Sequence, residues 1–280
     1  MFYDPIKDRM GAFFSQRPLL QRLFYAGLDT VFLRTWHVKK HIRQTFVQWP
    51  AYKPLRILDA GTGFGQYAWF LVRTFPQAQI LAVDVKHDYL ANAKRFMNQT
   101  AHAERVRWTW ADLTDFHPEE RFDFILSVDV MEHIEDDEAV FRNFAAALDE
   151  GGCVLINTPS DLGGSDAEIE GESFISEHVR DGYNLQELHE KLERAGLTPF
   201  RSVYTYGRFG SLAWRLLLKY PMKILGKSRF FIVFLPVYYL AVLPIGLILN
   251  ALDVSTKNPQ GTGVLVLARK TATMVYEKEF

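Results

Sequence analysis

The stretch 55–66 limits the fold of this chain more than any other part of the sequence. It reads LRILDAGTGFGQ, an apolar run of strand length followed by three glycines at alternate positions, Gly61, Gly63 and Gly65. Residues 67–75 are then apolar at helical spacing. Glycine allows a tight turn and the close approach of a ligand to the backbone. The start of a helix offers unpaired N–H groups and a partial positive charge. A strand, a glycine turn and a helix in this order predict a cofactor-binding turn.

This turn differs in two details from the dinucleotide-binding fingerprint G-x-G-x-x-G. The third glycine comes one residue early, so Gln66 stands in its place, and Asp59 precedes the turn. A carboxylate there would repel a pyrophosphate but hold an ammonium group. The arrangement resembles motif I of the class I S-adenosylmethionine-dependent methyltransferases. The resemblance implies that Asp59 positions the methionine part of the cofactor S-adenosyl-L-methionine, while Gly61, Thr62 and Gly63 pass beneath it.

Two further carboxylates stand at the ends of predicted strands. Asp84 ends the strand 80–84, and a carboxylate there can accept both ribose hydroxyls of a nucleoside. Asp112 follows the next strand, where it can accept a hydrogen bond from the adenine amino group. A helix N-cap and an ordinary turn aspartate are the alternatives for these two residues. Their neighbours Val85 and Leu113 complete the predicted nucleoside site.

The segment 122–134 reads FDFILSVDVMEHI and resembles motif IV of the same family. The resemblance implies that Ser127 and Val128 line the place where the methyl group is transferred. Methyl transfer requires in-line alignment and an unprotonated nucleophile, so a hydroxyl acceptor needs a base. His133 is one candidate base, because a similar Glu–His pair occurs in small-molecule methyltransferases such as the ubiquinone-biosynthesis O-methyltransferases and the cyclopropane-lipid synthases. A histidine that only shapes the pocket is the alternative.

A second candidate base lies in the acidic loop that follows the fifth predicted strand. This loop often covers the substrate in the family, so His178 is predicted to assist proton removal and Tyr183 to point into the pocket. A simple tether before the next helix is the alternative. Neither His133 nor His178 has cysteine or histidine partners at ligand spacing, so no metal site is predicted.

Strand and helix signals alternate along residues 55–207, which predicts an α/β fold with parallel strands and helices on both faces. With the resemblance, the prediction becomes a Rossmann-like, seven-stranded, mostly parallel sheet whose last strand, 263–270, is antiparallel. Residues 1–53 are predicted to form an N-terminal helical cap over the cofactor. The methyltransferase domain would comprise 54–207 and 260–272, with an apolar helical insertion, 208–259, between the last two strands.

The insertion is the least soluble-looking part of the chain. Residues 208–252 contain six basic residues and no acidic one, and 230–249 carry no charge. About twenty apolar residues can span a bilayer, but both flanking strands must join one sheet, so the chain has to return to the side that it left. Pro221 is predicted to divide the basic part into two short helices. Pro236 and Pro244 are predicted to break the apolar run into pieces that enter a membrane and return.

These patterns predict a monotopic or re-entrant membrane dock that binds anionic lipid through its basic stripe. The alternatives are an extra helical layer on the sheet, a substrate tunnel or a dimer interface; a nucleic-acid patch is disfavoured because motif IV lacks the signature of nucleic-acid amino methyltransferases. The single cysteine, Cys153, and the lack of an export signal favour a cytoplasmic setting. The predicted function is methylation of a lipid, quinone, isoprenoid or other membrane-presented acceptor. A soluble small-molecule methyltransferase and a non-catalytic scaffold are the other hypotheses, and the sequence does not indicate the oligomeric state.

Overall fold

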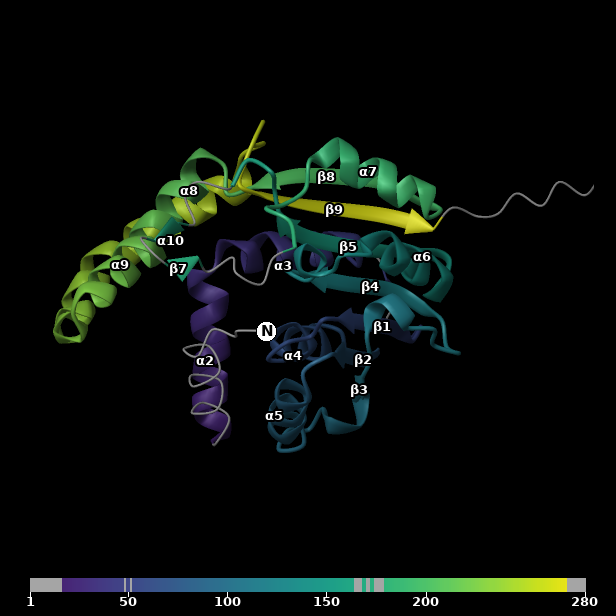
Figure 1. The fold of residues 1–280 in the computed structure, drawn as a ribbon. Helices are drawn as coiled ribbons and strands as arrows, with labels where there is room; N and C mark the ends of the chain where they lie inside the picture. The colour runs from purple at the N-terminus through teal and green to yellow at the C-terminus, as the bar shows by residue number, and fades with distance from the viewer. Residues whose placement is uncertain are drawn as a thin grey trace, which may run out of the picture.

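A seven-stranded sheet forms the centre of the computed structural model, which describes residues 17–47, 49–50, 52–163, 168–169, 172–173 and 179–270. The strand order is β3-β2-β1-β4-β5-β9-β8 (Figure 1). The strands are β1 (Leu55–Ala60), β2 (Ala78–Asp84), β3 (Val106–Trp110), β4 (Phe122–Val128), β5 (Leu148–Pro159), β8 (Leu197–Thr205) and β9 (Gly263–Lys270). A separate two-stranded pair is formed by β6 (Glu168–Ile169) and β7 (Glu172–Ser173).

The strand directions confirm the predicted fold class. β1 pairs in parallel with β2 and β4, and β4 pairs in parallel with β5. β9 is antiparallel to both of its neighbours, β5 and β8. It follows that β8 runs in the same direction as β5. The carboxyl ends of β1, β2, β4, β5 and β8 therefore lie at one edge of the sheet, the edge at which open α/β sheets bind ligands.

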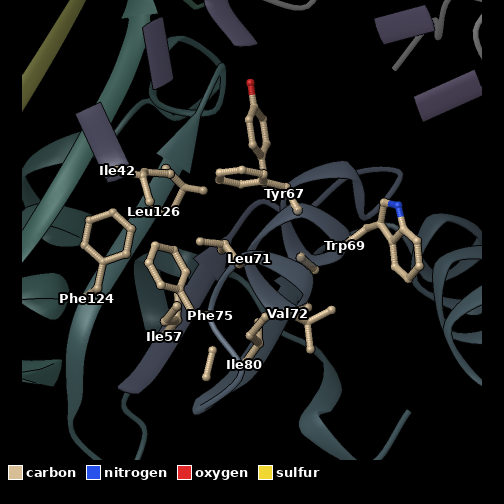
Figure 2. Close-up of a cluster of buried hydrophobic side chains, with 14 of the residues drawn as sticks. Ile42, Ile57, Tyr67, Trp69, Leu71, Val72, Phe75, Ile80, Phe124 and Leu126 are labelled. Carbon is tan, nitrogen blue, oxygen red and sulfur yellow. The ribbon is translucent and has the colours of Figure 1, made fainter. Parts of the chain in front are cut away.

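Helices cover both faces of the sheet. They are α2 (Pro18–Val31), α3 (Leu33–Thr45), α4 (Gln66–Thr74), α5 (His87–Met97), α6 (Asp137–Ala147) and α7 (Leu185–Arg194), and short 3₁₀ turns occupy η1 (Ala103–Arg105), η2 (Leu113–Asp115) and η3 (Met131–His133). Successive strand residues point to opposite faces, so Ile57 and its neighbour Leu58 belong to two different buried clusters. Figure 2 shows the first cluster, in which Ile42 of α3 and Leu71 of α4 pack on Ile57 of β1 and Phe124 of β4.

Between β8 and β9 the chain forms a helical hairpin, residues 208–255, that extends away from the sheet (Figure 1). Its outgoing arm consists of α8 (Arg208–Trp214), the π-helix η4 (Arg215–Lys219) and α9 (Tyr220–Lys227). After the 3₁₀ turn η5 (Arg229–Phe234), the returning arm is α10 (Leu235–Ser255), which packs along α8 and η4.

The returning arm corrects the prediction that two prolines break the apolar run. α10 is one continuous helix of 21 residues. Pro236 lies in its first turn, where no backbone N–H is needed. Pro244 lies inside the helix, which continues past it. The hairpin thus returns to its starting side by pairing two long helical arms, without the short broken pieces that the sequence suggested.

Pro221 does not divide the outgoing arm into separate helices either, because the helical path continues through η4 into α9. Proline has no N–H, so the Leu217 carbonyl, four residues before it, loses its α-helical donor. Two tyrosines of α10 donate to carbonyls in this turn: the hydroxyl of Tyr239 to the Leu217 carbonyl and that of Tyr238 to the neighbouring Leu216 carbonyl, each at 2.7 Å. The hairpin therefore satisfies these backbone groups internally.

Among the described residues, one helical stretch, Ile232–Ser255, is long and apolar enough to cross a membrane by length and composition. The core helices of soluble proteins can pass the same test, but they are mostly buried. Here only 6% of the most apolar window is buried inside the structure. In this structure the stretch is therefore mostly exposed and does not form a layer packed on the sheet.

Candidate functional site

The glycine turn is built by backbone contacts at the carboxyl edge of the sheet. The N–H groups of Gly61 and Thr62 donate to the Val83 carbonyl of β2, at 2.8 and 2.9 Å. Gly61 has a φ of +77°, and a Cβ on it would lie 2.3 Å from the Val130 side chain. Glycine is required at this position both for its conformation and for the close approach of the loop after β4.

Substituting Gly61 by alanine should therefore destabilise the protein, and Gly196 provides a matched control. Gly196 also has a positive φ, +83°, but a Cβ there would meet nothing within 4 Å. We expect Gly196→Ala to cost about 1–2 kcal/mol from backbone strain alone and Gly61→Ala about 1–3 kcal/mol more from crowding. Denaturant unfolding of both variants checks this difference, and equal losses would show that Val130 yields to the added methyl group.

Asp59, at the end of β1, is a buried carboxylate. Only 2% of the residue is exposed, and the Thr62 hydroxyl donates to its Oδ2 at 2.6 Å. Burial raises the pKa of Asp59 to about 7. No salt bridge joins Asp59 to a cation in the part of the chain that the structure describes. An ammonium group of a ligand would supply that counter-charge.

Asp84 lies at the end of β2 and fastens the glycine turn. Its Oδ2 accepts the Gly63 N–H at 2.7 Å, and its Oδ1 accepts the Lys86 N–H at 2.9 Å. Burial raises the pKa of its carboxyl, and these backbone donors act in the opposite direction. The N-cap of α5 is Lys86 and not Asp84, so the capping alternative does not describe this residue. A carboxylate has about four acceptor positions, so Asp84 retains acceptor capacity beside these backbone donors, which suits a ligand hydroxyl.

Asp112 and its neighbours form the outer end of the same edge. Asp112 is exposed and is the N-cap residue of η2. Its Oδ1 accepts hydrogen bonds from the N–H and the hydroxyl of Thr114. Leu113 is buried, whereas Val85 is 51% exposed. The indole of Trp110 donates to the Val85 carbonyl at 2.8 Å. Asp112 therefore makes the local hydrogen bonds of an ordinary turn aspartate. It also lies just after the end of β3, as the sequence predicts.

Polar side chains that were not predicted as site residues, those of Asn157, Asp129 and Arg34, lie near the end of β4. Ser127 and Asn157 are buried, and neither the Ser127 hydroxyl nor the Asn157 Oδ1 has a hydrogen-bond partner. The Asn157 Nδ2 donates to Asp129 Oδ1 at 3.1 Å, and Asp129 also forms a salt bridge with Arg34 of α3. Asp129 adopts a left-handed conformation with φ +52°. Val128, the last residue of β4, is half-buried beside this group.

Asp129 could have been found from the sequence, because it directly follows a predicted strand in motif IV. Arg34 could not. It lies in the cap helix α3, far away in the sequence, and no motif marks it. The Tyr206 hydroxyl, at the end of β8, accepts the Arg34 N–H at 3.2 Å. The cap therefore contributes directly to this end of the site, which we call the acceptor end: Arg34, Asp129, Asn157 and Tyr206.

The candidate bases are placed differently from one another. His133 is exposed on η3, and His178 lies outside the described residues. Glu132, which the sequence analysis did not single out, is 1% exposed and accepts the Thr158 hydroxyl at 3.0 Å. Burial, with the nearby Asp129, raises the pKa of Glu132 to about 8. Glu132 is thus a second buried acid next to the acceptor end.

The prediction that Tyr183 points into the pocket is corrected by its contacts. Tyr183 is fully buried in the second hydrophobic cluster. Its hydroxyl donates to Asp137 Oδ2 at 2.5 Å and lies 3.2 Å from the Met131 carbonyl. Arg180 also donates to that hydroxyl, at 2.9 Å. Because its ring packs in the core and its hydroxyl is held by these groups, Tyr183 has a structural role.

The N-terminal cap closes over the glycine turn. The Tyr25 hydroxyl of α2 donates to the Phe64 carbonyl. Gln66, which replaces the expected third glycine, donates through Nε2 to Asp29 of α2 at 2.7 Å and to Thr35 of α3 at 3.3 Å. The departure from the dinucleotide fingerprint therefore has a local purpose: the side chain at this position ties the turn to both cap helices.

Comparison with known proteins identifies the domain that holds this site. Residues 57–152 match the family model described as "Methyltransferase domain". A ubiquinone biosynthesis O-methyltransferase from Bradyrhizobium sp. is 33% identical over 110 residues, which are 37% of this chain and 40% of that protein. The chain spans 28–42% of the length of the first curated relatives that it matches.

Two solved structures share the fold. A putative sarcosine dimethylglycine methyltransferase from Galdieria sulphuraria has a TM-score of 0.58 at 21% identity and covers 84% of this chain and 83% of that one. Phosphoethanolamine N-methyltransferase 2 from Haemonchus contortus, in complex with S-adenosyl-L-methionine, has a TM-score of 0.56 at 22% identity and covers 84% of this chain and 53% of that one. Residues 57–152 therefore belong to the methyltransferase domain family, and the chain as a whole shares the fold of these two methyltransferases.

Proposed function

We propose that this protein uses S-adenosyl-L-methionine to methylate a lipid-soluble acceptor at the cytoplasmic face of a membrane. The observation that carries the membrane part is the exposed apolar hairpin, which leaves the sheet at the same edge as the candidate site. β8 ends at Thr205 on that edge, and the hairpin begins three residues later.

The residues present fit the proposed cofactor. The buried Asp59 lacks a cation and can pair with an ammonium group, and Asp84 retains acceptor capacity for the ribose hydroxyls. Gly63 leaves room for a ligand above the turn, because a Cβ there would meet nothing within 4 Å. The unpartnered hydroxyl of Ser127 and Oδ1 of Asn157 are buried polar atoms that a ligand can satisfy. Asp112, Val85 and Leu113 would bound the adenine.

In this mechanism the bound cofactor supplies an activated methyl group. The protein aligns the cofactor and keeps water out of the site. Asp59 and Asp84 would hold the two ends of the cofactor, and Ser127 and Val128 would line the place of methyl transfer. Tyr25 of the cap and Gln66 of α4, through its hydrogen bond to Asp29 of the cap, would close the glycine turn from above and exclude water. For a hydroxyl acceptor, His133 would take the proton, because it is exposed on η3, shortly after the end of β4.

The raised pKa of Asp59 gives a prediction for cofactor binding. An ammonium ligand pairs with the ionised carboxylate, so affinity should rise with pH up to about 7, the pKa in the cofactor-free protein. The rise should approach about tenfold per pH unit below that value. Calorimetry between pH 5.5 and 7.5 measures it, and Asp59→Asn should bind weakly with no such rise. If Asp59→Asn keeps the slope, another group is responsible.

The same shift affects stability with the opposite sign. The folded pKa of Asp59 lies above the unfolded value of about 3.9, so the folded protein binds the extra proton. The free energy of unfolding contributed by this group is present below pH 4 and declines as pH rises towards 7. Unfolding at pH 5 and pH 7 with and without Asp59→Asn separates this contribution from that of Glu132.

Several features of the hairpin support membrane docking. A helix that is apolar all round is normally covered by protein core or by lipid, and α10 is covered by little protein. Residues 208–252 carry only basic charges, which suits an anionic membrane surface. Backbone groups must be satisfied internally in lipid, and Tyr239 donates to the Leu217 carbonyl, which Pro221 leaves without its helical donor, while Tyr238 donates to the neighbouring Leu216 carbonyl. Relatives named for ubiquinone biosynthesis and for phosphoethanolamine fit a lipid-related acceptor.

The alternative function is that of a soluble small-molecule methyltransferase whose hairpin forms a tunnel or a dimer interface. One observation favours it: a cavity of about 380 Å³ lies between the hairpin arms, lined by Leu216, Tyr220, Lys223, Ile224, Tyr238 and Val242. A soluble ligand or a second copy of the chain could fill this space. The third hypothesis is a non-catalytic scaffold. The presence of all three carboxylates, Asp59, Asp84 and Asp112, at the sheet edge argues against it.

Incubation with isotopically labelled S-adenosyl-L-methionine and a lipid extract tests the proposal. Transfer of label into an extractable lipid, with a mass increase of one methyl group, is expected. Label that enters only water-soluble compounds would favour the soluble enzyme, and no transfer to either fraction would favour the scaffold. Asp84→Ala serves as the inactive control.

A further inference from the structure

We propose that Asp253 is a positioning residue that couples the membrane hairpin to the methyl-transfer site through helix α3. This inference rests on the proposed function. Asp253 lies near the end of α10 and is fully buried. A buried carboxylate must be compensated by donors, and the identity of those donors is what points to a link.

The donors to Asp253 come from each element that meets at the base of the hairpin. His37 of α3 lies with its Nε2 2.8 Å from Asp253 Oδ1. The Gly210 N–H of α8 donates to Oδ2 at 2.9 Å, and the Asn258 Nδ2 donates to Oδ1 at 3.2 Å. Asn258 also donates to the Tyr204 carbonyl of β8. One carboxylate therefore joins both hairpin arms, the cap helix and the sheet.

The side chains around Asp253 are tightly packed. A Cβ on Gly210 would lie 2.4 Å from Leu33 of α3 and 2.8 Å from Asp253 Oδ2. Lys40, one turn after His37, donates to the Val254 carbonyl. His37 and Asp253 are 4% and 0% exposed at their side chains. Movement of α10 at its base must therefore displace α3 or break buried hydrogen bonds.

The same helix contacts the site within the turn before His37. Arg34 forms the salt bridge with Asp129 at the acceptor end, and its N–H donates to the Tyr206 hydroxyl. Thr35 accepts a hydrogen bond from Gln66 at the start of α4, beside the glycine turn. α3 thus contacts the cofactor turn, the acceptor end and the hairpin base through neighbouring residues. A ligand at either end must fix this one helix.

The physical consequence is reciprocal binding. Lipid bound to the hairpin and cofactor bound to the glycine turn would each order α3. The second ligand to bind would then lose less conformational entropy, because the first has already ordered the helix. Vesicles should therefore tighten cofactor binding, and the cofactor should tighten vesicle binding by the same factor. A coupling of about fivefold or more is expected, because measured couplings between sites start at that size.

The experiment uses the full chain, S-adenosylhomocysteine as a non-reacting probe, and vesicles of phosphatidylglycerol and phosphatidylcholine. Calorimetry gives the Kd of the probe with and without vesicles, and flotation gives vesicle partition with and without the probe. In the wild type both should change by the same factor. In Asp253→Asn, and equally in His37→Gln, the factor should fall to one while each binding measured alone stays within about twofold of wild type.

Tyr238→Phe is the matched control, because it removes a partly buried hydrogen bond inside the hairpin without touching α3. It should keep the coupling. The double variant Asp253→Asn/His37→Gln should lose no more than either single variant, since both remove one link. A wild type that binds both partners with a factor of one, or an Asp253→Asn variant that keeps the factor, overturns the positioning role alone. A wild type that binds the probe but no vesicles overturns the membrane proposal and the coupling with it.

Discussion

Replacing Asp84 by alanine should lower the affinity for S-adenosyl-L-methionine at least about a hundredfold while the protein stays folded. The carboxylate would hold two ribose hydroxyls, and a hydrogen bond to a charged group contributes about 1.5–3 kcal/mol. The side chain also holds the Gly63 and Lys86 N–H groups, so the turn itself loses its fastening. Calorimetry measures the affinity, and circular dichroism checks the fold.

Asp88→Ala is the matched control for this variant. Asp88 is exposed in the first turn of α5, four residues from Asp84. The same loss of one carboxylate there should leave the affinity within about twofold, because exposed charges contribute little. Normal cofactor binding by Asp84→Ala would end the assignment of this edge as the cofactor site.

Glutamate at Val233, near the tip of the hairpin, should abolish binding to anionic vesicles. Val233 is 67% exposed, and burying such a side chain in lipid contributes about 1.5–3 kcal/mol. Placing a charge in the bilayer instead costs about 2.5–3.5 kcal/mol at its centre. Together these effects predict a loss of at least about a hundredfold in vesicle partition. Cofactor affinity without vesicles should not change, because the tip is remote from the glycine turn.

Val47→Glu is the control for charge and exposure. Val47 is 77% exposed just after α3, outside the hairpin, and its substitution should leave flotation unchanged. Size-exclusion chromatography of both variants addresses the alternative partner. If Val233→Glu floats like wild type but converts a dimer to a monomer, the hairpin tip contacts a second copy of the chain and not a membrane.

The fold was predictable because its signals are local. The strand at 55–60, the glycine turn and the later strand-end carboxylates each occupy a short stretch, and the β-α alternation then determines a parallel sheet. Even the last strand, 263–270, was placed correctly, because the family resemblance implies an antiparallel last strand after the insertion. Tyr183 was misplaced for a related reason: its position after a loop says nothing of which face its ring packs against.

The acceptor end was only partly predictable, because its residues come together through tertiary contacts. Asp129 follows motif IV, but its partner Arg34 lies 95 residues earlier in a cap helix with no sequence signature. The prolines of the hairpin were read as breaks because a proline removes a donor. The sequence does not reveal that Tyr239 on the opposite arm compensates Pro221, since that compensation depends on how the arms pair.

The position of β9 also has a consequence for how the chain is synthesised. β9 lies between β5 and β8 and forms hydrogen bonds with both, yet it follows the hairpin in the sequence. Until the ribosome has released residues beyond 262, one edge of each of these strands has no partner, and unpaired edges promote aggregation. The sheet can close only after the apolar hairpin has emerged, so early capture of the hairpin by a lipid surface would protect the nascent protein while it waits for its final strand.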